Sequence, residues 1–155
     1  MMAADPVQTP LTPKLVGALY TEAMLLADEV RAYFDRHGRE ERDSLDPILR
    51  VGFSCESLKV TTRLMHVIAW LLTQRAVETG ELTALQARKP TRRLGEAADS
   101  DSSVVARLPA HAIALIEASR DLYARVQRLD ETGVTPTHAA PSPARSLLSR
   151  LERSF

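Results

Sequence analysis

The side chains of this sequence that could bind a metal ion or act as a nucleophile are four histidines and one cysteine. The histidines are His37, His66, His111 and His138. No two of them are separated by four residues, the spacing that places two imidazoles side by side on a helix, so the pattern does not predict a metal site. Cys55 has no neighbouring general base in the sequence, and we expect a buried structural thiol there.

Other catalytic patterns are also missing from the sequence. Glu40 and Glu41 are adjacent, as are Asp28 and Glu29, and adjacent residues on a helix do not face each other. The glycines follow no P-loop or GxGxxG pattern, and no serine lies in a GxSxG motif. We therefore expect a binding protein that has no catalytic residues, no cofactor and no metal ion.

Composition narrows the class of protein further. The chain has 155 residues, and 20 Lys and Arg side chains are balanced by 20 Asp and Glu. A net charge of zero does not favour a nucleic-acid-binding protein. The longest apolar run, residues 67–72, is much shorter than the roughly 20 residues that cross a bilayer, so we expect no membrane insertion. A single cysteine allows no intrachain disulfide, which favours the cytoplasm.

Apolar residues at helical spacing predict three long helices and an all-α fold. Thr12–Pro13 and Asp46–Pro47 each combine an N-cap residue with proline at the first helical position, so we expect helices to begin there. We expect the first helix to end at Gly38, with that glycine in the left-handed conformation, and the second helix to end at Gly80. The third helix is expected over residues 109–132.

These helices predict a three-helix antiparallel bundle with a long central helix. We expect the bundle to occupy residues 14–132, between a flexible arm over residues 1–13 and a disordered tail over residues 133–155. The connection between the second and third helices is nearly thirty residues long, with a short helical turn expected near its start. Connections of this length are uncommon in compact domains. It is either a solvated loop or a loop that docks a partner.

The central helix carries a broad apolar arc of roughly 200° and, opposite to it, a polar stripe. The stripe consists of Glu56, Lys59, Arg63, His66, Trp70 and Gln74. A large aromatic side chain among charges is typical of an interface anchor. This pattern favours a homodimer that uses Lys59, Arg63, His66, Trp70 and Gln74 as its partner or dimer surface. The alternative is that Trp70 covers side chains of a neighbouring helix in the same chain.

The C-terminal segment joins a linker that contains three prolines to a short amphipathic end. The basic and apolar residues of that end include Arg145, Leu147, Leu148, Arg150, Leu151 and Phe155. Because eleven residues are too few for a stable isolated helix, we expect a tethered recognition element that is disordered in the free protein. It would order in a groove of a partner, or fold back onto its own bundle.

Several motifs of this chain resemble those of the alphaproteobacterial DUF1465 family. They read CESLKVTTRLM at residues 55–65, WLLTQRA at 70–76, GELT at 80–83, LIEAS at 115–119 and RLD at 128–130. The resemblance covers roughly residues 14–132. Helix packing could account for the apolar motif residues, such as Leu64 and Leu71, whereas partner binding could account for Arg63, Trp70 and Gln74.

The resemblance implies a small dimeric helical adaptor rather than an enzyme. An adaptor of this kind helps to deliver cell-cycle regulators, including the response regulator CtrA, to the ClpXP protease. It would act together with the regulators CpdR and PopA, near a cell pole. The alternative is a structural or scaffolding dimer that localises partner proteins without delivering them.

Overall fold

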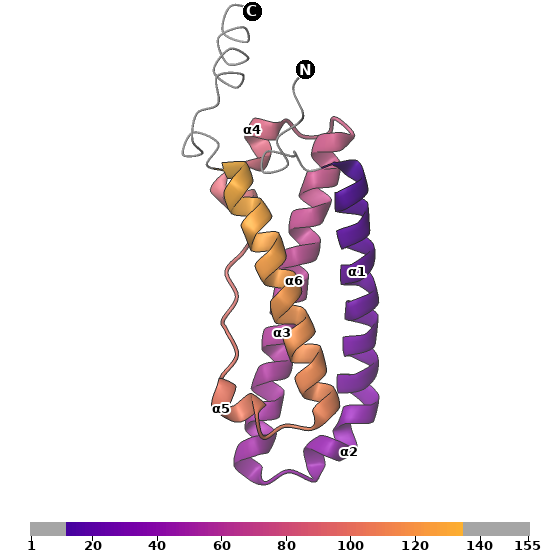
Figure 1. The fold of residues 1–155 in the computed structure, drawn as a ribbon, viewed down its shortest axis with the longest axis vertical. Helices are drawn as coiled ribbons and strands as arrows, with labels where there is room; N and C mark the ends of the chain where they lie inside the picture. The colour runs from indigo at the N-terminus through magenta and orange to yellow at the C-terminus, as the bar shows by residue number, and fades with distance from the viewer. Residues whose placement is uncertain (1–11, 135–155) are drawn as a thin grey trace, which may run out of the picture.

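The computed structural model describes residues 12–134, and every regular element within that range is helical, which confirms the all-α class (Figure 1). Three long helices lie side by side: α1 (Pro13–Ala32), α3 (Pro47–Glu78) and α6 (Ala110–Val134). The connecting elements are a π-helical turn (Tyr33–His37), α2 (Gly38–Asp43), α4 (Ala84–Ala87), a 3-10 turn (Pro90–Arg92) and α5 (Ser102–Val105).

The helix starts follow the local sequence as predicted. The Thr12 side chain accepts a hydrogen bond from the N–H of Leu15 at 3.1 Å, and Asp46 accepts one from the N–H of Leu49 at 2.9 Å. Each bond satisfies a backbone donor that has no partner within the first turn of its helix. Gly80, with φ of 81°, adopts the left-handed conformation just beyond α3. Thr12 thus confirms the predicted start of the first helix, and Asp46 and Gly80 confirm the predicted bounds of the central helix.

The predicted end of the first helix is wrong. Gly38 has a right-handed helical φ of −74°, and the chain continues through the π-helical turn into α2. Gly38 is required there for close packing, because an added Cβ would lie 3.0 Å from the ring of Tyr33 and 3.2 Å from that of Phe53. A glycine that serves packing and a glycine that serves a turn cannot be distinguished by residue type alone.

The bundle is not antiparallel throughout. α1 runs opposite to α3 and α6, but α3 and α6 run in the same direction (Figure 1). The contacts show this order: Arg63 donates to Ser119, whereas Trp70, two turns further along α3, donates to Asp130, three turns further along α6. The long connection makes this possible, because it carries the chain back from the end of α3 to the start of that helix.

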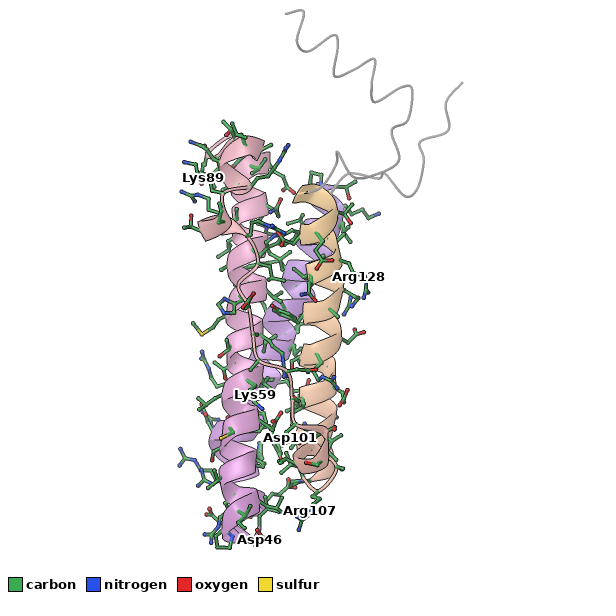
Figure 2. All side chains as sticks on the ribbon, turned by 90° about the vertical axis from the view of Figure 1, so that its left-hand side faces the viewer. Asp46, Lys59, Lys89, Asp101, Arg107 and Arg128 are labelled. Atoms are coloured by element: carbon green, nitrogen blue, oxygen red, sulfur yellow. The ribbon has the colours of Figure 1, made fainter. Side chains whose placement is uncertain are left out.

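Residues 93–101 form the return path, and we call this segment the strap. It has no regular secondary structure, and in Figure 2 it descends along the bundle between α3 and α6. Nine extended residues reach about 30 Å, the length of about 20 helical residues. The strap therefore spans enough of α3 for α6 to begin near the opposite end of the bundle.

The core is mainly aliphatic and lies where α3 packs against both α1 and α6. Its fully buried members include Val16, Ala23, Val60, Val67, Leu71, Ile116, Leu122 and Val126. This arrangement makes α3 the central helix, as predicted. None of the helices in residues 12–134 combines the length and the apolar character needed to span a membrane.

Candidate functional site

The polar stripe predicted as a partner or dimer surface lies largely inside the bundle. Arg63 is only 2% exposed and Trp70 only 3%. Lys59, His66 and Gln74 are partly exposed. The interpretation of Trp70 as an exposed interface anchor is therefore wrong, and the alternative that it packs within its own chain is correct. The physical reason is that the strap and α6 cover this side of α3.

Arg63 is the centre of the covered side. Its guanidinium donates to Ser119 Oγ on α6 at 3.1 Å, to the Ala98 carbonyl at 3.1 Å and to Ser100 Oγ at 2.7 Å. One side chain thus joins α3, α6 and the middle of the strap. Burial lowers the pKa of Arg63, and the nearby carboxylates of Asp99 and Glu56 oppose that shift. Because each bond ends on an acceptor within the chain, the desolvation cost of this charge is offset locally.

Glu56 is buried two helical turns before Arg63 on α3, and it binds the end of the strap at Asp101. Its Oε2 atom accepts from Lys59 Nζ at 2.9 Å and from the backbone N–H of Asp101 at 3.2 Å. Figure 2 places Lys59 and Asp101 close together along this edge of α3. Burial by itself would raise the pKa of Glu56, but hydrogen bonds from Ser100, Lys59 and Asp101 outweigh it and lower that pKa overall.

Trp70 and Asp130 fix the other end of the strap, at Arg93. The indole N–H of Trp70 donates to Asp130 Oδ1 at 2.9 Å, and Arg93, the first residue of the strap, donates to Asp130 Oδ2 at 3.1 Å. The hydroxyl of Tyr123 on α6 donates to the Gly95 carbonyl at 2.6 Å. An added Cβ at Gly95 would lie 2.3 Å from the imidazole of His66, so the strap passes directly against α3 there.

These contacts bear on the first interpretation of the long connection, that of a solvated loop. Five side chains from α3 and α6 bind the strap or its immediate partners: Glu56, Arg63, Trp70, Tyr123 and Asp130. The strap is therefore a fixed part of the fold rather than a solvated loop. The partners of the strap on α3 and α6 cannot be assigned from spacing along the sequence.

The opposite side of α3 carries an exposed apolar stripe, which we treat as the candidate functional site. Its members are Ile48, Val51, Cys55, Leu58, Met65, Ala69 and Leu72. The five large aliphatic side chains among them, counting Met65, are about half exposed or more, from 48% for Leu72 to 82% for Ile48. Contiguous apolar surface of this extent is typical of an interaction site in a protein.

The spacing along the apolar stripe alternates between three and four residues from position 48 to position 72. Thr62 fills the one heptad position without an apolar side chain, and its hydroxyl donates to the Leu58 carbonyl at 2.9 Å. That bond satisfies the hydroxyl within the helix. A 3-4 alternation is the pattern by which one helix packs along another in a coiled coil. The stripe is about 36 Å long at 1.5 Å per residue.

The residues of the apolar stripe are visible in the sequence, but a helical wheel of α3 does not separate them from the buried apolar residues. Val51, Leu58, Met65 and Leu72 all belong to the apolar arc predicted for the central helix, and an apolar arc on a central helix favours contact with its neighbouring helices. The structure divides the arc, burying one half and exposing the other. Cys55, predicted as a buried thiol, is exposed within the stripe.

Two further predictions concern metal ions and the tail. Within residues 12–134, no three His, Cys, Asp or Glu side chains come together in a way that could hold a metal ion. The tail residues Arg145, Leu147, Leu148, Arg150, Leu151 and Phe155 lie outside the described residues, as do most of the proposed linker and the N-terminal arm.

Comparison with known proteins places the chain in a family. The model of DUF1465, described as a protein of unknown function, matches residues 7–155. The chain belongs to the DUF1465 family. The crystal structure of RcdA from Caulobacter crescentus CB15 is similar, with 33% sequence identity and a TM-score of 0.65 over 79% of this chain and 93% of that one. No curated protein matches the chain.

The motifs that this chain shares with the DUF1465 family coincide with the strap contacts. Glu56 and Arg63 come from the first motif, Trp70 from the second, Ser119 from LIEAS and Asp130 from RLD. Every one of these side chains is buried. Of the two interpretations of the motifs, internal packing therefore accounts for Arg63 and Trp70, and partner binding is not needed to explain them.

Proposed function

We propose that this protein is a non-enzymatic adaptor that brings other proteins together, with delivery of cell-cycle regulators such as CtrA to the ClpXP protease as its specific role. The observation that carries the proposal is the exposed apolar stripe, in a chain whose fold is similar to that of RcdA. A long apolar face without a partner in the described part of its own chain fits a protein whose task is association. CpdR and PopA are the further partners that this role implies.

We assign the apolar stripe to a second copy of this chain, which makes the proposed adaptor a homodimer. Two α3 helices would match each other in length and in the 3-4 spacing, the condition for continuous knobs-into-holes packing. A homodimer of this kind is isologous, with the same patch on both copies. The surface replaces the predicted one at Lys59, Arg63, His66, Trp70 and Gln74.

The amphipathic end of the tail is a poorer match for the stripe. Residues 145–155 would form a helix of about 16 Å, less than half of the stripe. We propose instead that this segment contacts a partner protein. The linker of about eleven residues before it gives a root-mean-square reach of about 20 Å, which would hold a second contact at a high local concentration.

A reconstituted degradation assay tests the adaptor role. Purified ClpXP and CtrA are combined with CpdR and PopA, with and without this protein, and the loss of CtrA is followed over time. An adaptor raises the initial rate of degradation. A rate that does not change at any concentration of the protein would favour the alternative, a scaffold that localises partners without delivering them.

Sedimentation equilibrium tests the homodimer separately. The double variant Leu58→Lys/Met65→Lys places two charges in the centre of the stripe and is expected to sediment as a monomer with unchanged helical content. Leu25→Lys on α1 is the matched control, because Leu25 is 65% exposed and Leu58 is 67% exposed. A wild-type chain that is monomeric at all concentrations, or a control that dissociates equally, would refute the assignment.

Deletion of residues 135–155 tests the tail. The truncated chain is expected to keep the helical content of the bundle and the dimer, and to lose one partner interaction in the degradation assay. If it supports degradation of every cargo at the full rate, the tail has no such role.

A further inference from the structure

A cluster of four basic residues occupies the corner between α4 and the strap. It consists of Arg88, Lys89, Arg92 and Arg93, and we call it the basic corner. The position of Lys89 in Figure 2 shows that it lies at the end of the bundle where α3 ends. Within the described residues, the side chains of Arg88, Lys89 and Arg92 make no hydrogen bond or ion pair. The charges of these three side chains therefore do not stabilise the fold through ion pairs.

The backbone of the basic corner is fixed by local structure. Thr83 and Gln86 form a reciprocal capping box at the start of α4, with hydrogen bonds of 3.0 and 2.9 Å. Pro90 then begins the 3-10 turn, where its ring restricts φ. The four cations are thus held on a preformed turn rather than on a loop that would have to be ordered on binding, which lowers the entropic cost of binding a ligand.

A cavity of about 340 Å³ opens between this turn and α3. His66, Thr73, Thr91, Arg92 and Arg93 contribute polar groups to its lining, and Trp70 lines it as well. No described residue in the lining carries a carboxylate. Two other cavities along the strap differ in this respect, since both contain the carboxylate of Glu96, and one of them is also lined by Arg88 and Arg93.

Arg93 connects the cavity with the strap. Its Nη2 atom is bound to Asp130, which fixes the guanidinium in place. Its Nε atom is buried and has no acceptor within hydrogen-bond distance among the described residues. A buried donor without an acceptor is costly, and an anionic oxygen in the cavity is the kind of acceptor that would satisfy it.

We propose that the basic corner and its cavity bind an acidic segment of a partner protein. A carboxylate side chain would enter the cavity near Arg92 and Arg93, while Arg88 and Lys89 face neighbouring carboxylates of the same segment. Arginine pairs well with carboxylates because its planar guanidinium can donate two parallel hydrogen bonds. This inference takes one point from the proposed function, that the partner is a protein. It does not depend on the homodimer.

Binding of a fluorescein-labelled octaglutamate peptide to the full chain tests the proposal. We expect saturable binding that weakens as salt is raised, and no binding of the matched octaglutamine peptide. The triple variant Arg88→Gln/Lys89→Gln/Arg92→Gln should weaken binding by about tenfold or more, because it removes the charges that face the peptide. The control Arg31→Gln/Arg36→Gln/Arg39→Gln removes the same charge near the opposite end of the bundle and should change the affinity less than about twofold.

The fluorescence of Trp70 supplies a second measurement, because it is the single tryptophan of the chain and lines the cavity. Octaglutamate binding should change its emission in the wild type, and an unchanged emission would refute the occupation of the cavity. Equal weakening in both triple variants would indicate nonspecific charge attraction and overturn the proposal. Inorganic phosphate that displaces the peptide at equal concentration would overturn it in favour of a small-anion site. Failure of the adaptor assay would leave these results unaffected.

Discussion

The two sides of α3 reverse the usual distribution of polar and apolar residues. The side that faces the strap carries Glu56 and Arg63 and is buried, whereas the side that carries Leu58 and Met65 is exposed. Charged side chains are rarely buried unless they are paired, and here each is paired with the strap or α6. The exposed apolar side has no such partner in the described chain. The polarity of a helix face therefore does not determine its burial, because a neighbouring segment can satisfy polar groups that would otherwise need water.

The largest expected effect comes from removing the central charge of the buried side. Arg63→Ala leaves Ser119, Ser100 and the Ala98 carbonyl without their donor, and we expect a loss of about 3–5 kcal/mol in the free energy of unfolding. Urea denaturation followed by circular dichroism measures it. The exposed Arg50 on the same helix is the control, and Arg50→Ala should change stability by less than about 0.5 kcal/mol. If Arg63→Ala lowers the free energy of unfolding no more than Arg50→Ala does, the contacts of Arg63 with the strap do not stabilise the fold.

Two leucines on opposite sides of α3 should differ in their effect on stability. Leu64 is 4% exposed and Leu58 is 67% exposed. Leu64→Ala should cost about 2–5 kcal/mol in any preparation, because it creates a cavity in the core. Leu58→Ala should cost less than about 0.5 kcal/mol at low protein concentration, and more as the concentration rises if the stripe forms a dimer. A cost for Leu58 as large as that for Leu64 at every concentration would contradict the division of α3 into two sides.

The hydrogen bond between Trp70 and Asp130 should have an intermediate effect. Trp70→Phe keeps a large aromatic ring but removes the indole donor, and we expect a loss of about 1.5–3 kcal/mol, the range for a hydrogen bond to a charged group. Thermal or urea unfolding measures it. In an Asp130→Asn background the cost of Trp70→Phe should shrink, since a double-mutant cycle isolates the coupling between the two groups. Full additivity would show that the ring matters only for its packing.

The pH dependence of stability should show the smallest effect. The pKa of Glu56 is lowered below its ordinary value of 4.5, so its ionised form favours the folded state. That contribution is complete above the ordinary value and is lost as the pH falls through the lowered value. We therefore expect the stability of the wild type to decrease more steeply below pH 4.5 than that of Glu56→Gln. The exposed Glu117 is the control position, and Glu117→Gln should follow the wild-type curve.

Much of the fold could be predicted from local sequence patterns. Thr12 and Asp46 each precede a proline and cap a helix, and Gly80 ends α3, because capping depends on residues within one turn of each other. The direction of α6 could not be predicted in this way. It depends on the path of the strap, and a connection of that length can either turn back or run the length of the bundle.

The same distinction between local sequence patterns and long-range packing applies to the candidate site. Residue types and spacing were enough to predict that α3 is long, that it is central, and that it carries both a polar stripe and an apolar arc. That Arg63 and Trp70 face inward, and that Leu58 and Met65 face outward, depends on how the helices and the strap pack together. The physical reason is that the acceptors for Arg63 and Trp70, on the strap and on α6, lie 35 to 60 residues away along the chain. A helical wheel counts the residues of one helix, whereas burial depends on what the rest of the chain places against each side.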